Sequence, residues 1–396
     1  MGETRSREQP VATVVAKIGS SSVTGAHGVD VDAIARFCAQ VAGLRDQGHR
    51  VVTVTSGAIA AGLPALGMTA ADGADVVTLQ AASAVGQSRL MRVYDDVLGG
   101  HGLVGGQVLL TPLDFMVRHQ YLHARRTLAR LLDLGVVPVV NENDAVADDE
   151  IRFGDNDRIA ALVAHLVAAD VLVLLTDTPG LLTADPRLDA GASLIEEILE
   201  VDAELEAVAG GTGSATGSGG MASKLAAARI AAWSGVRAVI ASATRPNVLA
   251  DAVAGVTGVG TVVRPRAKRL GARKLWIAFA VGAAGTVVVD EGARRALLER
   301  NVSLLAAGVG EVRGTFRADD AVELAGPDGR VFAKGLVRVG SAALAAMAGK
   351  RTSELAEGVP HEVVHRDDLV VLPSTNGPQG RGYLAATSSE KRSRRT

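Results

Sequence analysis

The feature that most constrains the fold is a regular alternation of short apolar runs and longer helical segments between residues 11 and 263. Six runs rich in Val, Ile and Leu have the length of strands: Val11–Ile18, Arg50–Thr55, Gly106–Leu110, Val136–Val140, Val171–Thr176 and Val236–Ala241. Segments with helical periodicity separate them: Val31–Gln47, Leu79–Leu98, Arg118–Leu134, Arg158–Ala168 and Met221–Ser234. Because the apolar runs do not alternate with polar residues, they are typical of strands buried on both faces. The order predicts an α/β three-layer sandwich with a mainly parallel central sheet.

A change of pattern after residue 263 predicts a second domain, as the length of 396 residues also favours. Residues 264–274 read RPRAKRLGARK and are interpreted as a linker. The runs that follow are shorter and strand-like, and they predict a small β-barrel-like domain over residues 275–372. They are 275–279, 285–289, 308–316, 321–324 and 331–339. The polar ends, residues 1–10 and 373–396, are expected to be a flexible N-terminus and a disordered tail.

Composition excludes several classes of protein. Lys plus Arg total 41 and Asp plus Glu total 43, so the net charge of -2 gives no strong field for nucleic acid. No apolar run approaches the roughly 20 residues of a membrane-spanning helix, and the polar first ten residues do not resemble a secretion signal. The single cysteine, Cys38, cannot form an internal disulfide. We therefore expect a cytoplasmic protein without a membrane partner.

Polar and basic residues follow the first two predicted strands. Lys17 stands at the end of the first strand and precedes Gly19, which lets a backbone approach a phosphate closely. Ser56 follows the second strand and precedes a helix start, where free N–H groups attract anions. Two plainer interpretations stay open: Lys17 as a surface lysine, and Ser56 as a helix cap.

The densest group of polar residues is NENDAVADDEIRFGDND, residues 141–157, between a predicted strand and a predicted helix. A connection of this length exceeds what joins a strand to a helix, and long loops are often functional. Asn and Asp side chains can accept from an ammonium group and, through the amide, donate to a carboxylate, as recognition of an amino acid requires. Capping of the helix by Asn156 or Asp157 accounts for one of these residues, not for all.

Two further stretches favour a nucleotide. Thr176 and Asp177 end a buried strand, where α/β sheets bind ligands, although a plain turn has the same composition. Residues 210–224, GGTGSATGSGGMASK, form a glycine-rich loop that leads into a helix. Its N–H groups can surround phosphates and Lys224 can reach the transferring group. A flexible linker is the alternative interpretation.

Taken together, these stretches resemble the amino acid kinase family. The resemblance rests on VVAKIGSSSVTG, VTVTSGAIAAG, AASAVGQSRLM, VVPVVNENDAVA, GDNDR, GLLTADPR and GSGGMASK, and it covers residues 11–241. The second domain resembles a PUA domain through VDEGARRALLER, SLLAAGV and VFAKGLVRV. The first loop departs from the family in reading SSS, and the glycine-rich loop holds more Gly and Ser than usual.

The resemblance implies particular site residues. ATP would be bound by Lys17, Thr176, Asp177, Ser218, Gly219, Gly220, Met221, Ala222, Ser223 and Lys224. Glutamate would be held by Ser56, Asp144 and Asn156. Lys17 and Lys224 would act in catalysis, with Asp157 ordering the two lysines. The cofactors would be ATP and Mg²⁺, and no protein metal ligand is expected.

The implied activity is ATP-dependent phosphorylation of the γ-carboxylate of L-glutamate, the first step of proline biosynthesis. The family further implies feedback inhibition by proline, assembly into a dimer or tetramer, and transfer of the acyl phosphate to a reductase. A kinase for acetylglutamate or aspartate is one alternative. Another is RNA binding by the PUA domain, for which the basic cluster at residues 264–274 is the one candidate surface near that domain.

Overall fold

The computed structural model describes residues 10–25, 28–69, 75–115, 117–146, 156–184, 189, 191–202, 205, 209, 220–267, 269–355, 360–372 and 383–385. The chain divides into two compact units. Unit 1 comprises Met1–Arg269 and Gly380–Thr396, and unit 2 comprises Leu270–Gln379. Each unit is described by itself. The division at residue 270 falls within the stretch interpreted as a linker.

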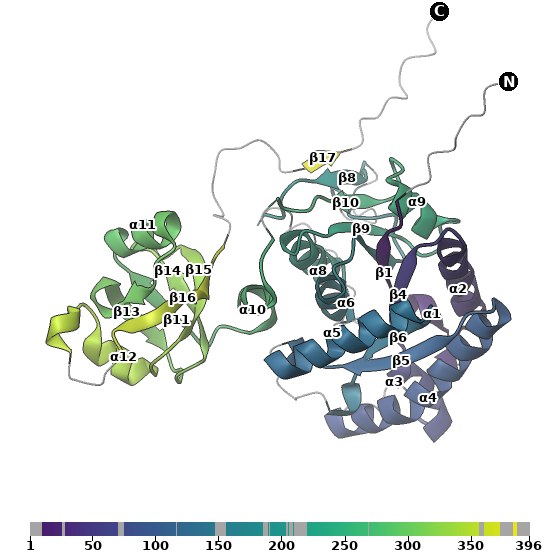
Figure 1. Cartoon of the computed structure of the whole chain (residues 1–396), viewed down its shortest axis with the longest axis horizontal. Helices are drawn as coiled ribbons and strands as arrows, with labels where there is room; N and C mark the ends of the chain where they lie inside the picture. Colours follow the sequence, from purple (N-terminus) through teal and green to yellow (C-terminus); the bar gives the residue numbers. More distant parts are fainter. Residues whose placement is uncertain are drawn as a thin grey trace, which may run out of the picture. The chain divides into compact units, whose positions relative to one another are not determined.

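Unit 1 is built on a nine-stranded sheet with the order β17-β8-β10-β9-β7-β1-β4-β6-β5 (Figure 1). Its strands are β1 (Thr13–Ile18), β4 (Arg50–Val54), β5 (Gly105–Leu110), β6 (Val137–Glu142), β7 (Val171–Thr176), β8 (Ile195–Ile198), β9 (Arg237–Ser242), β10 (Thr261–Val263) and β17 (Tyr383–Ala385). The pairs are parallel except where β10 meets β9 and β17 meets β8. The predicted α/β fold with a mainly parallel central sheet is therefore confirmed.

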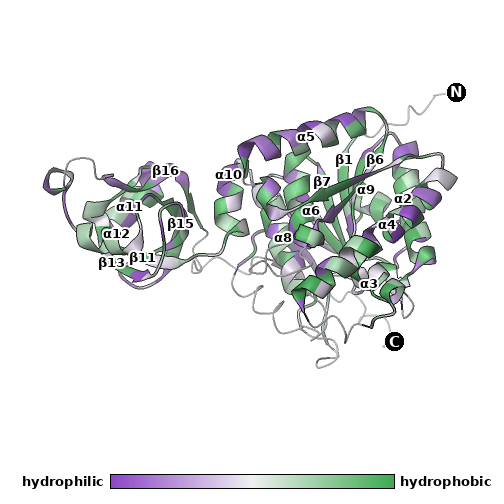
Figure 2. Cartoon of the chain, turned by 90° about the horizontal axis from the view of Figure 1, so that it is seen from below, coloured by the Kyte–Doolittle hydropathy of each residue, from purple (hydrophilic) through white to green (hydrophobic). Residues whose placement is uncertain are grey.

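Helices cover both faces of this sheet. They are α1 (Ser20–Val23), α2 (Val31–Asp46), α3 (Ala58–Gly62), α4 (Val76–Gly100), α5 (Arg118–Asp133), α6 (Asn156–Leu166), α8 (Met221–Trp233) and α9 (Val248–Ala254), with the 3-10 turns η1 (Pro64–Leu66), η2 (Pro112–Phe115) and η3 (Asp144–Val146). Apolar residues of α2, α4 and α9 form one core with alternate residues of β1 and β7, such as Val14 and Val173. Helices α6 and α8 pack on each other and contact β7 from the other side. Figure 2 shows the apolar strands between helices whose outer residues are hydrophilic.

Three short strands extend the sheet beyond the sequence prediction. Strands β8 and β10 have four and three residues, too few to give a period in the sequence. Strand β17 lies in the tail for which disorder was predicted, and it pairs antiparallel with β8. An edge strand exposes unpaired N–H and C=O groups, with which the backbone of a further segment can pair. The expectation of disorder is thus wrong for Tyr383–Ala385.

Unit 2 contains a six-stranded sheet with the order β12-β16-β15-β14-β11-β13. The elements are α10 (Ala272–Leu275), the π-helix η4 (Trp276–Ala280), β11 (Gly285–Val289), α11 (Glu291–Arg300), β12 (Leu304–Leu305), η5 (Ala306–Gly308), β13 (Val309–Gly314), β14 (Ala321–Ala325), β15 (Val331–Val337), α12 (Ser341–Met347), η6 (Thr352–Glu354) and β16 (Glu362–Val371). Its own core includes Val287, Leu324, Phe332 and Leu344. The predicted small β domain is present.

Two expectations for unit 2 need correction. The strand expected at residues 275–279 is helical, because the structure has α10 and η4 there. A short run that is apolar throughout has no period that separates a strand from a buried helix. Strand β16 was not predicted, since charged residues in EVVHRDDLVV interrupt its apolar pattern.

Candidate functional site

One buried carboxylate holds two lysines from distant parts of the chain. Lys17 Nζ lies 2.6 Å from Asp157 Oδ1, and Lys224 Nζ lies 3.3 Å from Asp157 Oδ2. Ser223 Oγ donates a hydrogen bond of 3.1 Å to the same Oδ2. Lys17, Asp157 and Lys224 are only 3%, 1% and 5% exposed. The two ammonium groups are therefore fixed next to each other with one negative charge between them.

The fold explains why these side chains meet. Successive residues of a strand face opposite sides, and on β1 the even positions Val14 and Ala16 belong to the core formed with α2 and α9. Lys17 therefore points to the other face, which α6 and α8 cover. Asp157 lies in the first turn of α6 and Lys224 in the first turn of α8, and the two helices pack together.

Burial and charge act in opposite directions on these groups. Burial by itself raises the pKa of Asp157, but Lys17 and Lys224 together with its hydrogen bonds hold that pKa below the ordinary value. For Lys224, burial lowers the pKa and the attraction of Asp157 only partly offsets this effect. With both lysines protonated, the three groups carry a net charge of +1 in a site shielded from water. Such a site attracts an anion and has its donors already in position.

The predicted nucleotide residues at the end of β7 lie by the same lysine. Thr176 is buried and its hydroxyl donates to Asp177 Oδ1 at 3.0 Å. Asp177 is exposed, and its charge acts on Lys224 to raise the lysine pKa. The carboxyl end of β7 and the start of α8 thus border one region.

The glycine-rich stretch is described only from Gly220 onward. Gly220 precedes α8, and Met221, Ala222, Ser223 and Lys224 form the first turn of that helix, where N–H groups lack partners within the helix. Ser218 and Gly219 lie outside the described residues. Ser223, for which the resemblance implies contact with ATP, donates a hydrogen bond to Asp157.

A second group of buried polar side chains surrounds the end of β6. Asp144 is 5% exposed, and its Oδ2 accepts a hydrogen bond of 3.2 Å from Ser83 Oγ on α4. Asn156 Oδ1 accepts the backbone N–H of Glu142 at 3.0 Å. Since Asn156 and Asp157 are consecutive on α6, this group adjoins the two lysines.

Burial controls the ionisation of Asp144. Burial raises the pKa of Asp144 to about 6, and the hydrogen bond from Ser83 opposes this shift without cancelling it. Asp144 Oδ1 has no hydrogen-bond partner among the residues that the structure describes. A buried carboxylate oxygen at this position is suited to accept a hydrogen bond from an ammonium group of a ligand.

Ser56 precedes α3, a short helix that packs closely on α4. It is buried at the end of β4 and precedes Gly57, whose φ of +104° favours glycine. Helices α3 and α4 touch at Gly62 and Gly86, where a Cβ would come within 1.8 Å of Ala82 O and Ala58 O respectively. The expected anion-binding helix start is weak here, because α3 has only five residues.

The structure adds residues that the sequence reasoning did not assign. Ser83 and Gln87 lie one turn apart on α4, and both face the end of β6 through hydrogen bonds to Asp144 and Asn141. Tyr94, on the same helix, donates to Thr55 Oγ1 at 2.8 Å. The sequence feature that could have indicated these residues is the presence of two polar residues at positions i and i+4 on an otherwise apolar helix face.

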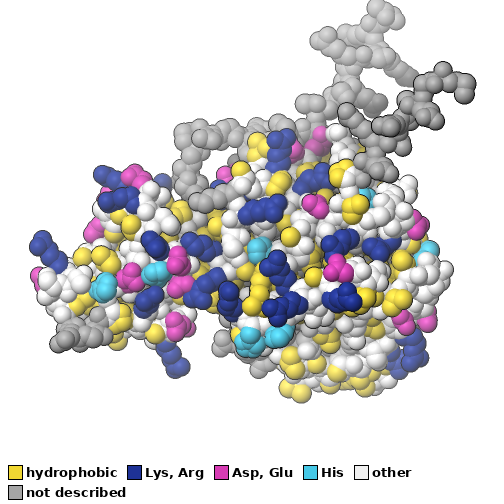
Figure 3. Space-filling model, viewed as in Figure 1, with side chains coloured by type: hydrophobic (Ala, Val, Ile, Leu, Met, Phe, Trp, Pro, Cys, Tyr) yellow, Lys and Arg dark blue, Asp and Glu magenta, His cyan; other side chains and the backbone are white. Residues whose placement is uncertain are grey.

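Several basic residues of the cluster at 264–274 form ion pairs or hydrogen bonds within their own unit. In unit 1, Arg264 pairs with Glu197, while Arg266 pairs with Glu200 and lies over the Trp233 ring. In unit 2, Arg273 pairs with Asp368 and Lys274 donates to a backbone carbonyl. Figure 3 shows other basic side chains over α5, whose exposed arginines are Arg118, Arg125, Arg126 and Arg130. The charge available at the cluster is thus smaller than its sequence indicates.

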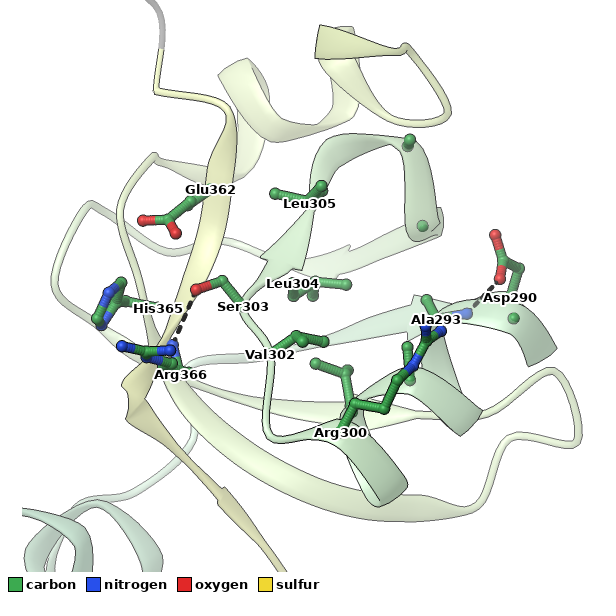
Figure 4. A pocket seen from close by; sticks show the side chains of 15 residues that line it. Asp290, Ala293, Arg300, Val302, Ser303, Leu304, Leu305, Glu362, His365 and Arg366 are labelled. Carbon is green, nitrogen blue, oxygen red and sulfur yellow. Dashed lines mark hydrogen bonds between the residues drawn. The ribbon is translucent and has the colours of Figure 1, made fainter.

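Unit 2 carries a cavity of about 770 Å³ that holds none of the predicted site residues. Leu297 and Leu304 are among its apolar lining residues, and Arg300 and Arg366 lie at opposite sides of it (Figure 4). Asp290 caps α11 by accepting from Ala293 N, and Glu362 pairs with Arg338. The lysine pair and its carboxylate have no counterpart in this lining.

Comparison with known proteins decides the family. Residues 12–242 match the amino acid kinase family. This chain belongs to that family. In addition, residues 285–359 of this amino acid kinase match the PUA domain, as expected for unit 2.

Curated relatives of this amino acid kinase match nearly the whole chain. Glutamate 5-kinase of Trichlorobacter lovleyi is 44% identical over 369 residues, which cover 92% of this chain and 98% of the relative. Glutamate 5-kinase of Burkholderia multivorans is 46% identical over 364 residues, which cover 91% and 97%. The similarity therefore extends through both units.

The described part of this amino acid kinase contains neither a cluster of metal ligands nor a membrane-spanning helix. Three or more His, Cys, Asp or Glu side chains do not gather there in a way that could hold a metal ion. None of the helices described combines the length and apolar character needed to span a membrane.

Proposed function

We propose that this chain transfers the γ-phosphoryl group of ATP to the side-chain carboxylate of L-glutamate, giving L-glutamyl 5-phosphate and ADP. The observation that carries the proposal is the pair Lys17 and Lys224 held by Asp157 beside the buried polar group of Asp144 and Asn156. The identity of 44% and 46% to glutamate 5-kinases over more than nine-tenths of the chain supports glutamate as the substrate.

ATP is assigned to the region between β7 and α8. Lys17 and Lys224 neutralise the phosphoryl oxygens, and the N–H groups of residues 218–222 add further donors. Thr176 and Asp177 at the end of β7 contact the nucleotide. Asp157 does not react: it holds both ammonium groups in place.

Glutamate is assigned to the group around the end of β6. Asp144 Oδ1 accepts from the substrate ammonium group, and Ser83 fixes the other carboxylate oxygen. Asn156 and Ser56 complete the pocket with an amide and a hydroxyl. Because Asn156 precedes Asp157, this arrangement directs the γ-carboxylate toward the lysine pair.

The reaction needs little acid or base chemistry from the protein. A glutamate side chain has an ordinary pKa of about 4.3, so its carboxylate is ionised at neutral pH and needs no general base. One carboxylate oxygen attacks the γ-phosphorus, the bond from that phosphorus to the β,γ-bridging oxygen breaks, and ADP leaves. Catalysis then comes from positioning and from cancelling charge on the transferring group.

Mg²⁺ fits the site as a companion of the nucleotide. Magnesium in kinases is usually held by substrate phosphates, water and one or two carboxylates. Among the described residues Asp177 is the exposed carboxylate close to Lys224. The ion would supply neutralisation of the phosphate charge.

The proposed product determines the expected partners. An acyl phosphate hydrolyses readily, so a reductase that consumes it directly is the natural next enzyme, and proline is the expected feedback inhibitor of this first step. We further propose a homo-oligomer and a cytoplasmic location, which a single buried thiol suits.

A coupled assay tests the proposal. Purified protein is incubated with MgATP, hydroxylamine and either L-glutamate, N-acetyl-L-glutamate or L-aspartate, and the hydroxamate and ADP are measured. We expect hydroxamate with L-glutamate at a kcat/KM at least a hundredfold above that of the other two acids. Hydroxamate formed chiefly from acetylglutamate or aspartate would contradict the proposal.

A further inference from the structure

A buried amide of α4 has donors for which the described residues provide no acceptor. Gln87 is 8% exposed, and its Nε2 has no hydrogen-bond partner within the described part of the chain. Gln87 is not among the residues to which the sequence assigned a role. A buried amide whose donors stay unpaired is costly, so a ligand is the natural source of the missing acceptor.

The hydrogen bonds around Gln87 fix which of its atoms is the donor. The backbone N–H of Glu142 donates to Asn141 Oδ1 at 2.9 Å, so the other atom of the Asn141 amide must be the nitrogen. That nitrogen, Nδ2, donates to Gln87 at 2.8 Å, so the atom receiving it must be Oε1. A backbone N–H group can only donate, so it fixes the orientation of the Asn141 amide and, through it, that of the Gln87 amide. Gln87 Nε2 is therefore a donor.

The neighbouring residue on the same helix face defines the second half of the site. Ser83 lies four residues before Gln87, about 6 Å along the helix axis. Its hydroxyl fixes Asp144, whose Oδ1 is a buried acceptor without a described partner. One turn of α4 thus fixes the acceptor Asp144 Oδ1 and presents the donor Gln87 Nε2, and neither atom has a partner among the residues that the structure describes.

The geometry points to Gln87 as the residue that recognises the α-carboxylate of the substrate, while Asp144 takes the α-ammonium group. A free amino acid carries these two groups on one carbon, so one molecule can use a donor and an acceptor that the same turn of α4 presents and supports. Asn141 is then a positioning residue that acts through Gln87. The inference rests on the proposed function and deepens it, because it explains selection of a free α-carboxylate.

The substitution Gln87→Glu tests this assignment. It keeps the oxygen that accepts from Asn141 and replaces only the NH2 group by oxygen, so a donor becomes an acceptor. The α-amide of L-glutamate is the matched probe, because it keeps the ammonium group and the γ-carboxylate and offers an NH2 group in place of the α-carboxylate oxygen. Affinities are measured as KM for L-glutamate and as the inhibition constant of the α-amide in the same assay.

We expect the preference for glutamate over its α-amide to fall at least about tenfold in Gln87→Glu, with KM for ATP within twofold of the parent value. Gln120→Glu, at an exposed position of α5, should leave the preference unchanged. If thermal melting shows that Gln87→Glu does not fold, Gln87→Met is used, and the preference should fall at least about threefold.

Two results separate the inference from the proposed function. Equal weakening of both ligands, or no change in either, would overturn the role of Gln87 while the parent enzyme still forms hydroxamate from glutamate. A parent enzyme that forms no hydroxamate from glutamate would instead refute the proposed function.

Discussion

Replacing Asp157 by Asn removes the one charge that holds the two lysines together. The carboxylate is 1% exposed and contacts both ammonium groups, at 2.6 and 3.3 Å. Its loss changes the net charge of the three groups from +1 to +2 in a buried site. Removing one member of a buried ion pair costs about 3–5 kcal/mol. For a unit of this size, about 2–4 °C of Tm is lost per kcal/mol, so Tm should fall by about 6–20 °C.

The assay for this prediction is thermal unfolding with and without ATP, together with hydroxamate formation. Since ATP supplies negative charge to the lysines, its addition should raise Tm by more in Asp157→Asn than in the parent protein. Turnover should fall by about a hundredfold or more, because the donors to the transferring group are no longer fixed. Asp133→Asn is the control, since its pair with Arg50 is exposed and should be worth less than about 1 kcal/mol. A Tm within 2 °C of the parent value, with turnover unchanged, would refute this reasoning.

Three further predictions concern other parts of the molecule. At saturating MgATP, KM for glutamate should rise about tenfold per pH unit below pH 6. Burial raises the pKa of Asp144 to about 6, so its carboxylate is ionised above that pH. Once protonated, Asp144 no longer attracts the substrate ammonium group. Asp144→Asn should give a high KM without that slope between pH 5 and 8, and a parent profile that is flat there would contradict the assignment. Gly86→Ala should destabilise unit 1 by about 3 kcal/mol in urea unfolding, since its Cβ would lie 1.8 Å from a backbone oxygen of α3. On the same helix, Gly99→Ala meets no atom within 4 Å and should stabilise by up to about 1 kcal/mol; equal effects would exclude the proposed helix contact. Burial raises the pKa of Cys38 to about 12, so a thiol reagent at pH 8 should label it only along the urea unfolding curve, and rapid labelling of the native protein would show that this thiol is accessible.

The central fold could be predicted because its strands are long and apolar throughout. Strands such as β1 and β7 are buried on both faces, so their sequences contain no polar interruption. The strands that were not predicted lack this long apolar pattern. β10 is too short to show a period, β16 carries charges on its exposed middle, and β17 joins the sheet through its backbone. Backbone pairing at a sheet edge leaves little trace in side-chain pattern.

The sequence predicted only part of the candidate site. Polar residues at strand ends can be recognised as candidates, but the side chains that contact them from other elements cannot. Lys17, Asp157 and Thr176 stand next to strands or helix starts, where α/β sheets bind ligands. Gln87 and Ser83 instead lie in the middle of α4. They belong to the site because Gly62 and Gly86 let α3 and α4 approach closely. The distance between two packed helices cannot be predicted from the local sequence.

Isotope transfer tests the central claim most directly, because it follows the oxygen that attacks phosphorus. L-Glutamate labelled with ¹⁸O in its side-chain carboxylate is incubated with MgATP, hydroxylamine and the protein, and the released phosphate is analysed by mass spectrometry. Attack by the carboxylate followed by cleavage of the acyl bond predicts one ¹⁸O atom in each phosphate. Phosphate without ¹⁸O would mean that water, not glutamate, receives the phosphoryl group, and it would contradict the account.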